Sequence, residues 1–174
     1  MKNNKGFSLI ELLIVVVIIG IIAAIAVPNL LASRRAANGA SAVESMRLFH
    51  SVQATYQAGV GNGNFGGTND LRGQQLIDDV LANAAQGIGS SQPGNSGNSP
   101  SGNSVAKSGY IFAINFSLAS NGQLSDFNAV GIPASTSGVN RSGDRSFYVD
   151  ATGVIRATTT ASTVATSSDS PIGN

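Results

Sequence analysis

The chain has 174 residues, a length that fits one small folded domain. Ten Lys and Arg residues against nine Asp and Glu residues leave a formal net charge of +1, which gives no broad electrostatic basis for nucleic-acid binding. The absence of Cys excludes disulfides and thiolate metal sites, and a single His excludes multi-His zinc sites.

The apolar residues concentrate near the amino terminus, in the run FSLIELLIVVVIIGIIAAIAV at positions 7–27. As a helix with a rise of about 1.5 Å per residue, this run would be roughly 31 Å long, which matches the hydrocarbon thickness of a bilayer. The rest of the chain has too few apolar residues to bury a helix that is apolar on all sides, so a core helix is disfavoured. The run therefore predicts a membrane-spanning helix.

The flanks of the run differ from those of an ordinary secretory signal. Such a signal has a shorter apolar stretch that is followed by a small-residue cleavage site. Here MKNNKG precedes the run and VPNLLASRR follows it, with no A-x-A site. Two lysines and the amino terminus on one side face Arg34 and Arg35 on the other, so the charge bias is weak and favours a cytoplasmic amino terminus.

Glu11 is an acid within the apolar run. A carboxylate in the hydrocarbon costs on the order of 2.5 to 3.5 kcal/mol on the mildest insertion scales, so it is by default functional and has a partner. No Lys, Arg or His lies in the same run. The partner is therefore expected to come from another molecule or from the chain's own terminus. The alternative is a protonated Glu11 that sits passively near the interface.

Gly20 and Pro28 weaken the backbone of the predicted helix. A Gly costs about 1 kcal/mol in a helix interior, and Pro28 cannot donate a hydrogen bond to the carbonyl of Ala24. We expect the helix to continue through both residues, bent near Pro28. An ordinary kink with no further role is the alternative interpretation.

After the apolar run the pattern becomes amphipathic. Apolar residues recur at spacings of three and four, which places them on one helical face. One helix from Phe7 to Ala58, ending at Gly59, is therefore predicted, with its second half packed under a sheet. His50 lies beside this face, where a partly exposed structural role is favoured over a proton sensor. The apolar positions are Ala42, Met46, Phe49, Val52 and Tyr56.

The residues after Gly59 predict a small head of mixed structure. A short helix is expected from Leu71 to Ala85, with Asn69 or Asp70 as its cap. Alternating and strongly apolar stretches predict strands at 110–116, 127–133, 146–150 and 154–157. Three or four antiparallel strands would form a meander packed on the stem helix, so the expected fold class is α+β.

Two segments are too polar to bury much surface. Residues 90–104 are low in complexity and are expected to form a mobile surface loop. Residues 158–174 are rich in Ser and Thr, and we expect a flexible tail that little anchors, open to O-linked modification.

The string KGFSLIELLIVVVIIGIIAAIAVPNL combines several features at fixed positions. A basic leader ends in Gly6, Phe7 follows, a single Glu stands four positions later, and Pro28 closes the apolar run. This pattern resembles the amino-terminal signature of type IV pilins and of the related pseudopilins of type II secretion. The resemblance is close over about the first thirty residues and looser as far as Tyr56.

The resemblance implies a maturation pathway. Gly6 would be the last leader residue, removed by a membrane-embedded prepilin peptidase, and Phe7 would then be N-methylated by the same enzyme. Glu11 would bind the freed amine of a neighbouring subunit, so cleavage would gate assembly. The stretch between Gly20 and Pro28 would lose helical hydrogen bonds in the filament.

The head offers no catalytic constellation, because its carboxylates are dispersed and none is paired in sequence with a base. Pseudopilins can carry a calcium site in the head, but Asp126, Asp144 and Asp150 follow no cation-loop spacing. We interpret them as solvated surface carboxylates. The prediction is therefore no enzyme activity, no metal site and no cofactor.

The predicted organisation has five parts. They are a leader at 1–6, a transmembrane and assembly helix at 7–28, an amphipathic stem at 29–58, a globular head at 59–157 and a flexible tail at 158–174. The implied function is that of a structural subunit of a type IV pilus. A pseudopilin of a type II secretion system and a low-abundance minor pilin or binding module are the alternatives.

The resemblance also implies partners and a location. The partners would be other pilin subunits in a homopolymer, the prepilin peptidase and N-methyltransferase, the pilus assembly platform and membrane lipid, with no nucleic acid. The precursor would cross the inner membrane once with its amino terminus in the cytoplasm, and the assembled fibre would be extracellular. Adhesion, motility, DNA uptake and electron transfer are family functions that the sequence leaves open.

Overall fold

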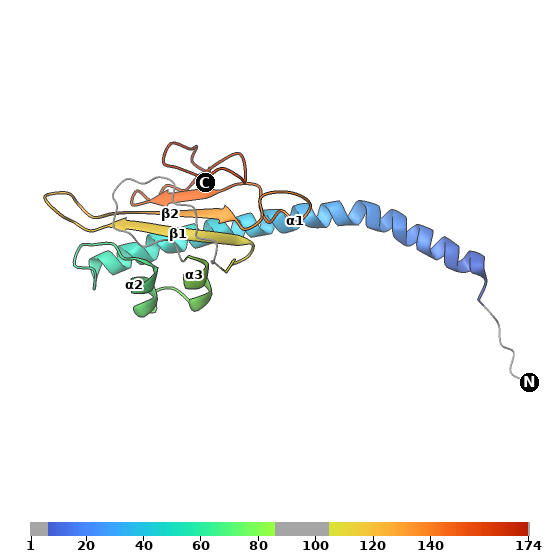
Figure 1. Cartoon of the computed structure of the whole chain (residues 1–174), viewed down its shortest axis with the longest axis horizontal. Helices are drawn as coiled ribbons and strands as arrows, with labels where there is room; N and C mark the ends of the chain where they lie inside the picture. Colours follow the sequence, from blue (N-terminus) through green and yellow to red (C-terminus); the bar gives the residue numbers. More distant parts are fainter. Residues whose placement is uncertain (1–6, 86–104, 174) are drawn as a thin grey trace, which may run out of the picture. The chain divides into compact units, whose positions relative to one another are not determined.

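The computed structural model of the chain describes residues 7–85 and 105–173 (Figure 1). The predicted leader at 1–6, with Gly6, and the predicted loop at 90–104 lie outside the described residues. The chain divides into two compact units, residues 1–34 and residues 35–174, and each is considered by itself.

Helix α1 spans Leu9–Ala58 without interruption, and Pro28 lies inside it. The predicted start at Phe7 is two residues early, because Phe7 and Ser8 are not helical. The predicted end is confirmed. The N–H of Gly59 donates to the carbonyls of Thr55 and Tyr56 at 3.1 and 3.2 Å, and the helix goes no further.

Four strands form one antiparallel sheet in the order β1-β2-β3-β4, as the sequence predicted. The long pair is in register from Tyr110 opposite Pro133 to Ser117 opposite Asp126. The α+β fold class is thereby confirmed. The strands are β1 at Tyr110–Ser117, β2 at Asp126–Pro133, β3 at Phe147–Asp150 and β4 at Arg156–Ala157.

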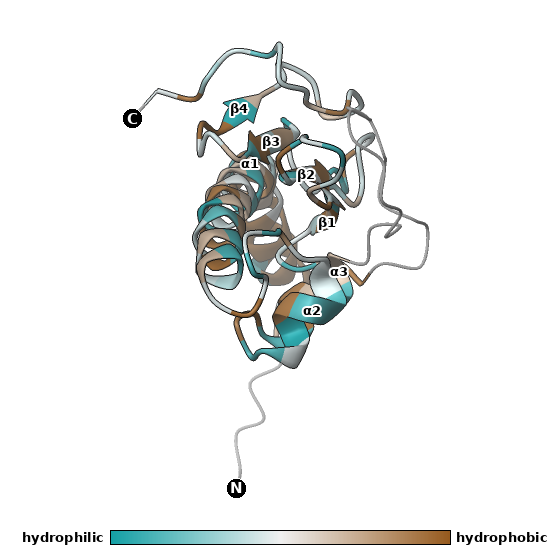
Figure 2. Ribbon diagram, turned by 90° about the vertical axis from the view of Figure 1, so that its left-hand side faces the viewer, coloured by the Kyte–Doolittle hydropathy of each residue, from teal (hydrophilic) through white to brown (hydrophobic). Residues whose placement is uncertain are grey.

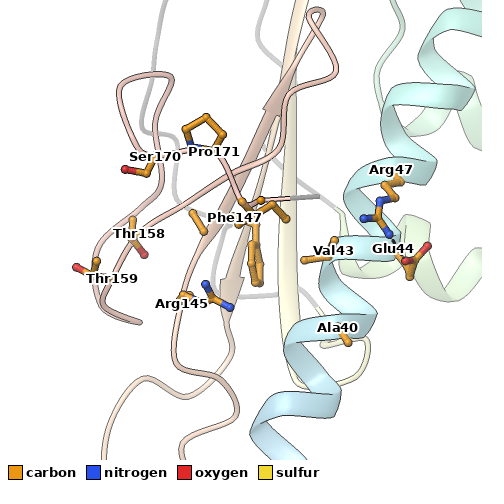
Figure 3. A pocket seen from close by; sticks show the side chains of 13 residues that line it. Ala40, Val43, Glu44, Arg47, Arg145, Phe147, Thr158, Thr159, Ser170 and Pro171 are labelled. Atoms are coloured by element: carbon orange, nitrogen blue, oxygen red, sulfur yellow. Dashed lines mark hydrogen bonds and ion pairs between the residues drawn. The ribbon is translucent and has the colours of Figure 1, made fainter.

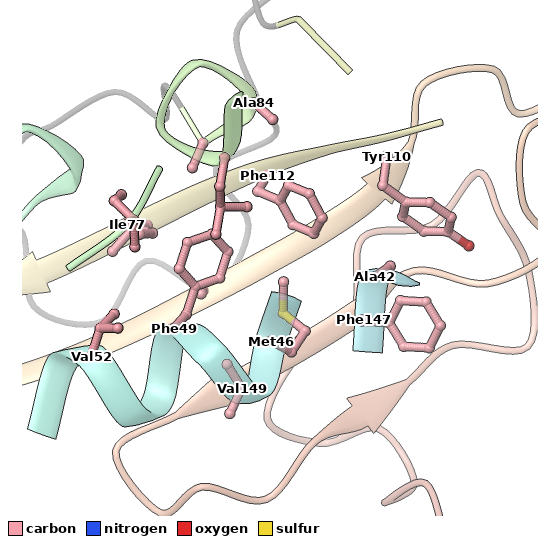
Figure 4. Close-up of a cluster of buried hydrophobic side chains, with 14 of the residues drawn as sticks. Ala42, Met46, Phe49, Val52, Ile77, Ala84, Tyr110, Phe112, Phe147 and Val149 are labelled. Carbon is pink, nitrogen blue, oxygen red and sulfur yellow. The ribbon is translucent and has the colours of Figure 1, made fainter. Parts of the chain in front are cut away.

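The core of the second unit lies between the sheet and the amphipathic half of α1 (Figure 4). Met46 and Phe49 are wholly buried, and the ring of Phe49 meets that of Phe112 edge-on with centroids 5.6 Å apart. Gly131 in β2 permits this approach, because an added Cβ would lie 2.8 Å from the Phe112 ring. Strands β2 and β3 carry the brown of hydrophobic residues in Figure 2. The predicted apolar face of the stem is therefore the face that packs.

Two short helices stand where one was predicted. They are α2 at Thr68–Gly73 and α3 at Asp79–Ala84. Gln75 between them has a φ of +56°, which no continuing α-helix allows. The predicted cap is also wrong, because α2 begins after Gly67, and Asp70 accepts the Gly67 N–H from within the helix at 2.8 Å. Asp78 caps α3 by accepting the Leu81 N–H at 2.6 Å.

The carboxy-terminal residues are anchored, so the expectation that little would hold them is wrong. Thr158 and Ser146 exchange two hydrogen bonds, at 3.1 Å and 3.0 Å. Further along, the N–H of Ala157 donates to the Ser170 carbonyl at 3.1 Å. Ala165 is wholly buried on the sheet beside Tyr148. Hydrogen bonds of hydroxyl groups and burial of small apolar side chains therefore attach this segment to the sheet.

Candidate functional site

The amino-terminal half of α1 carries a continuous apolar surface that nothing in its own unit covers. In the single chain, every large apolar side chain from Leu9 to Leu30 is at least 50% exposed. By length and composition α1 is capable of crossing a membrane. Such a surface needs either lipid or other apolar helices around it.

Glu11 lies at the start of this helix and binds the backbone of its own chain. Its Oε2 accepts a hydrogen bond from the N–H of Ser8 at 2.9 Å, and the Glu11 N–H donates to the Ser8 carbonyl at 3.1 Å. Ser8 is the residue before the first helical position, and Glu11 is the third helical residue, as in a capping box. The carboxylate thus caps the positive end of the helix dipole.

The backbone of Ser8 is a partner of Glu11 that the sequence did not predict. The expected partner was another molecule or the chain's own terminus, because no Lys, Arg or His lies in the apolar run. The signal was present as Ser-x-x-Glu at positions 8–11, a pattern typical of helix starts.

The other predicted site residues are spread along the helix. Phe7 is 81% exposed and directly precedes the Ser8 N–H that Glu11 binds, so these residues share one helix end. At about 1.5 Å per residue, Gly20 and Pro28 lie roughly 13 and 25 Å from Glu11 along the axis. A Cβ added to Gly20 would meet no atom within 4 Å, so packing in this chain gives no reason for a glycine there.

The head carboxylates that the sequence singled out separate into two places. Asp144 pairs with Arg35 at 3.2 Å and with Arg141 at 2.7 Å. Asp126 and Asp150 instead line a polar cavity of about 350 Å³. The part of the chain that the structure describes contains no group of three or more His, Asp or Glu residues that could hold a metal.

Tyr148 forms one wall of the same cavity. Burial raises the pKa of its phenol to about 12, and the carboxylates of Asp150 and Asp126 add to the shift. The phenol therefore stays protonated at any physiological pH, and its hydrogen bond with the Asp150 carboxylate also raises its pKa. His50 packs elsewhere, where a Cβ on Gly153 would lie 2.9 Å from its Nε2.

A second cavity, of about 540 Å³, lies between the stem and the carboxy-terminal segment (Figure 3). Glu44 and Arg47 form an ion pair on its helical wall. Arg145 and Phe147 contribute to the opposite wall. These groups do not assemble a nucleophile with a base, so the lining has the chemistry of a surface groove.

Comparison with known proteins points to the same segment. Residues 1–27 match the family model described as the prokaryotic N-terminal methylation motif. Over 57 residues the chain is 49% identical to the type IV wide pilus major component PilA4 of Thermus thermophilus, covering 33% of this chain and 44% of that protein. Over 54 residues it is 42% identical to the type IV major pilin protein PilA of Myxococcus xanthus, covering 31% and 24%.

The matches cover less than half the length of either relative, and no solved structure matches the chain. The segment that matches the family model, residues 1–27, contains Glu11 and most of the exposed apolar surface of α1. The chain is therefore similar to type IV pilins over about a third of its length, and the resemblance that its sequence suggested is confirmed.

Proposed function

We propose that the protein is a structural subunit of a type IV pilus, cleaved after Gly6, N-methylated on Phe7 and polymerised through the apolar half of α1. The observation that carries the proposal is an exposed apolar helix with one capping acid at its start, within a match to the methylation motif over residues 1–27. Two relatives named as major pilins of type IV pili support it.

Cleavage supplies the chemistry that assembly needs. Hydrolysis of the bond between Gly6 and Phe7 releases a protonated amine on Phe7. Glu11 uses Oε2 to hold the Ser8 N–H, and a carboxylate accepts further hydrogen bonds at its second oxygen. The amine of a neighbouring subunit binds there. In hydrocarbon this pairing offsets the desolvation of both charges, and an uncleaved neighbour offers no such amine.

The location and remaining partners follow from this route. The precursor is a single-pass protein of the inner membrane with its amino terminus in the cytoplasm, where the prepilin peptidase and N-methyltransferase act on it. The assembly platform then transfers subunits from lipid into an extracellular fibre. The protein is a structural component and not an enzyme, consistent with the dispersed titratable groups of the described residues.

Substitutions at Glu11 test the docking role separately from the capping role. Glu11→Gln keeps an oxygen that accepts from Ser8 but loses the charge, whereas Glu11→Ala loses both. We expect both variants to be processed and to stay in the membrane, with no fibres in the sheared fraction of the native host. Wild-type fibre yield from Glu11→Gln would contradict the docking role.

Mass spectrometry of the sheared fraction tests maturation. Wild-type fibres are expected to contain chains that begin with N-methylated Phe7, and Gly6→Val is expected to leave the leader attached. Detection of a mature chain from Gly6→Val would refute the cleavage site. A methylated chain found only in the envelope fraction would indicate a pseudopilin or a minor subunit instead.

A further inference from the structure

Two groups of charged side chains in the head lie at opposite ends of its sheet. In the pair of β1 and β2, Tyr110 lies opposite Pro133 at one end, and Ser117 lies opposite Asp126 at the other. We call these the Tyr110 end and the Asp126 end. At about 3.3 Å per residue, seven steps separate them by roughly 23 Å.

The Tyr110 end holds more cations than its carboxylate can neutralise. Asp144 is shared between Arg35 and Arg141, with N···O distances of 3.2 and 2.7 Å. The loop that carries Asp144 is fixed at this end, because the side-chain amide of Asn38 on α1 donates to the Ser142 carbonyl at 2.8 Å.

Two further cations at the Tyr110 end have no acidic partner among the described residues. Arg145 follows Asp144 in the sequence. Its carbonyl accepts a hydrogen bond from the Tyr110 hydroxyl at 2.9 Å, which places the Arg145 backbone at the Tyr110 end. The backbone of Lys107 pairs with that of Tyr110. Neither side chain forms an ion pair within residues 7–85 and 105–173, and Arg145 is exposed. This end therefore has four cations against one carboxylate.

The Asp126 end has the opposite charge and a cavity. Asp126 and Asp150 line the polar cavity of about 350 Å³, and neither forms an ion pair in the part of the chain that the structure describes. Asp126 is exposed, and its carboxylate accepts the neighbouring Phe127 N–H at 2.9 Å. Asp150 accepts the Thr152 N–H at 2.9 Å and the Thr152 hydroxyl through the same oxygen, Oδ1. The nearby Arg156 donates to the Asp169 carbonyl at 3.0 Å.

We propose that the Asp126 end receives the Tyr110 end of a second copy of this chain, with the guanidinium of Arg145 entering the cavity between Asp126 and Asp150. The inference rests on the proposed function, because a filament brings many copies of the head together. Charge complementarity identifies the occupant, since like ends repel and unlike ends attract. A planar guanidinium with five donors suits two carboxylates on the lining of one cavity.

The contact is of the head-to-tail kind. Each chain uses one surface to bind and a different surface to be bound, so the contact repeats without closing on itself. Because the two surfaces lie at opposite ends of one sheet, occupation of the first leaves the second free. The proposal therefore adds a polar contact between heads to the association of the apolar helices.

Cysteine cross-linking tests which surfaces meet. The chain has no Cys, so Asp126→Cys together with Arg145→Cys introduces the only thiols. Within one chain these thiols are too far apart for a disulfide, whose Cα atoms lie within about 7 Å. We expect oxidised sheared fibres to give a ladder of multimers that a reductant abolishes. Arg72→Cys with Arg145→Cys is the control, and fibres with no ladder, or an equal ladder from the control, would overturn the proposal.

Charge reversal tests the same contact without thiols. Asp126→Arg or Arg145→Asp alone places like charges at every contact, and we expect a fall in fibre yield of about fivefold or more. The double variant restores opposite charges between neighbours, so its yield should recover to near the wild-type value. The deficit of each single variant should shrink as salt is raised, because ions screen exposed charges.

The outcomes separate this contact from the pilus function itself. If the wild-type host makes no fibre that contains this chain, the proposed function is refuted. Fibres of equal yield from the wild type and all three charge variants would refute only the head contact. If a small cation or a polar ligand fills the cavity instead, Arg145→Asp will leave fibre yield unchanged, which also overturns the inference.

Discussion

Gln53 offers the sharpest test of how the head is held together. Its side chain is wholly buried on α1. The Nε2 group donates to the Gly66 carbonyl at 2.6 Å, and the Gly66 N–H donates to Oε1 at 3.0 Å. This reciprocal pair ties the segment between α1 and α2 to the stem. A side chain of the same shape that cannot donate should therefore weaken the head.

Gln53→Glu makes that change with almost no change in volume. The ionised carboxylate still accepts the Gly66 N–H, but its other oxygen faces the Gly66 carbonyl oxygen with no proton between them. An unsatisfied buried acceptor costs about 1 to 3 kcal/mol, and burial of the new charge adds to it. We expect a loss of about 3 kcal/mol in the free energy of unfolding at pH 7.5.

The loss should depend on pH with a definite sign. Burial and the facing carbonyl raise the pKa of the introduced Glu above its ordinary value of about 4.3. The folded state then binds the proton more tightly than the unfolded state, so stability falls as pH rises above about 4.3. Near pH 4 the protonated acid donates to Gly66 as the amide did, and most of the loss should disappear.

Urea unfolding of the full chain in detergent micelles, followed by near-ultraviolet circular dichroism, measures this difference against wild type at each pH. Gln53→Leu is the matched control, because it removes both hydrogen bonds and has no proton to bind. Its loss should be similar at pH 4 and pH 7.5. Equal losses for the Glu variant at the two pH values would refute the reasoning.

Three further predictions follow from single side chains and can be checked in the same detergent system. Phe49→Ala, at a position with 0% exposure, should lower the free energy of unfolding by about 3 to 5 kcal/mol in urea titrations. Gly153→Ala should cost about 1 to 2 kcal/mol, because Gly153 has a φ of +75° and the new Cβ would lie 2.9 Å from the His50 ring; His50→Ala in the same chain should recover only the steric part. Burial raises the pKa values of Tyr110 and Tyr148 to about 12, so the tyrosinate absorbance of these two groups should appear near pH 12. Because the folded state binds both protons more tightly than the unfolded state, the free energy of unfolding should fall as pH rises from about 10 to 12.

Periodicity in the sequence predicted the parts of the fold that large apolar residues determine. Phe112 and Ile114 alternate along β1, and Met46 and Phe49 recur on one face of α1, so the strand, the helix and the side on which they meet were predictable. The break between α2 and α3 was not, because Gln75 has no intrinsic preference for the left-handed conformation that it adopts. Tertiary contacts overrode local pattern at that point.

Composition misled the interpretation of the carboxy-terminal residues for a different reason. Ser and Thr usually indicate solvent exposure, yet Ser146 and Thr158 satisfy each other's backbone groups where the chain doubles back on the sheet. The buried anchors there are Ala161 and Ala165, whose side chains give almost no periodic signal. A small side chain can close a sheet face only when the fold brings it there, so the anchoring becomes visible only in three dimensions.

The sequence predicted that Glu11 is functional but not that the Ser8 N–H holds its carboxylate. This local hydrogen bond affects how cleavage would control assembly. The carboxylate is held by the N–H of Ser8, a bond that lies after the predicted cleavage point. In the proposed maturation, hydrolysis after Gly6 breaks neither partner of this hydrogen bond, so we expect Ser8 to hold the carboxylate in the precursor and in the mature chain. The group that cleavage adds beside this contact is the amine of Phe7. In the proposed assembly, the mature subunit donates the new charge and its neighbour's carboxylate is already in position, so one uncleaved chain would accept a mature neighbour but could not dock onto the next.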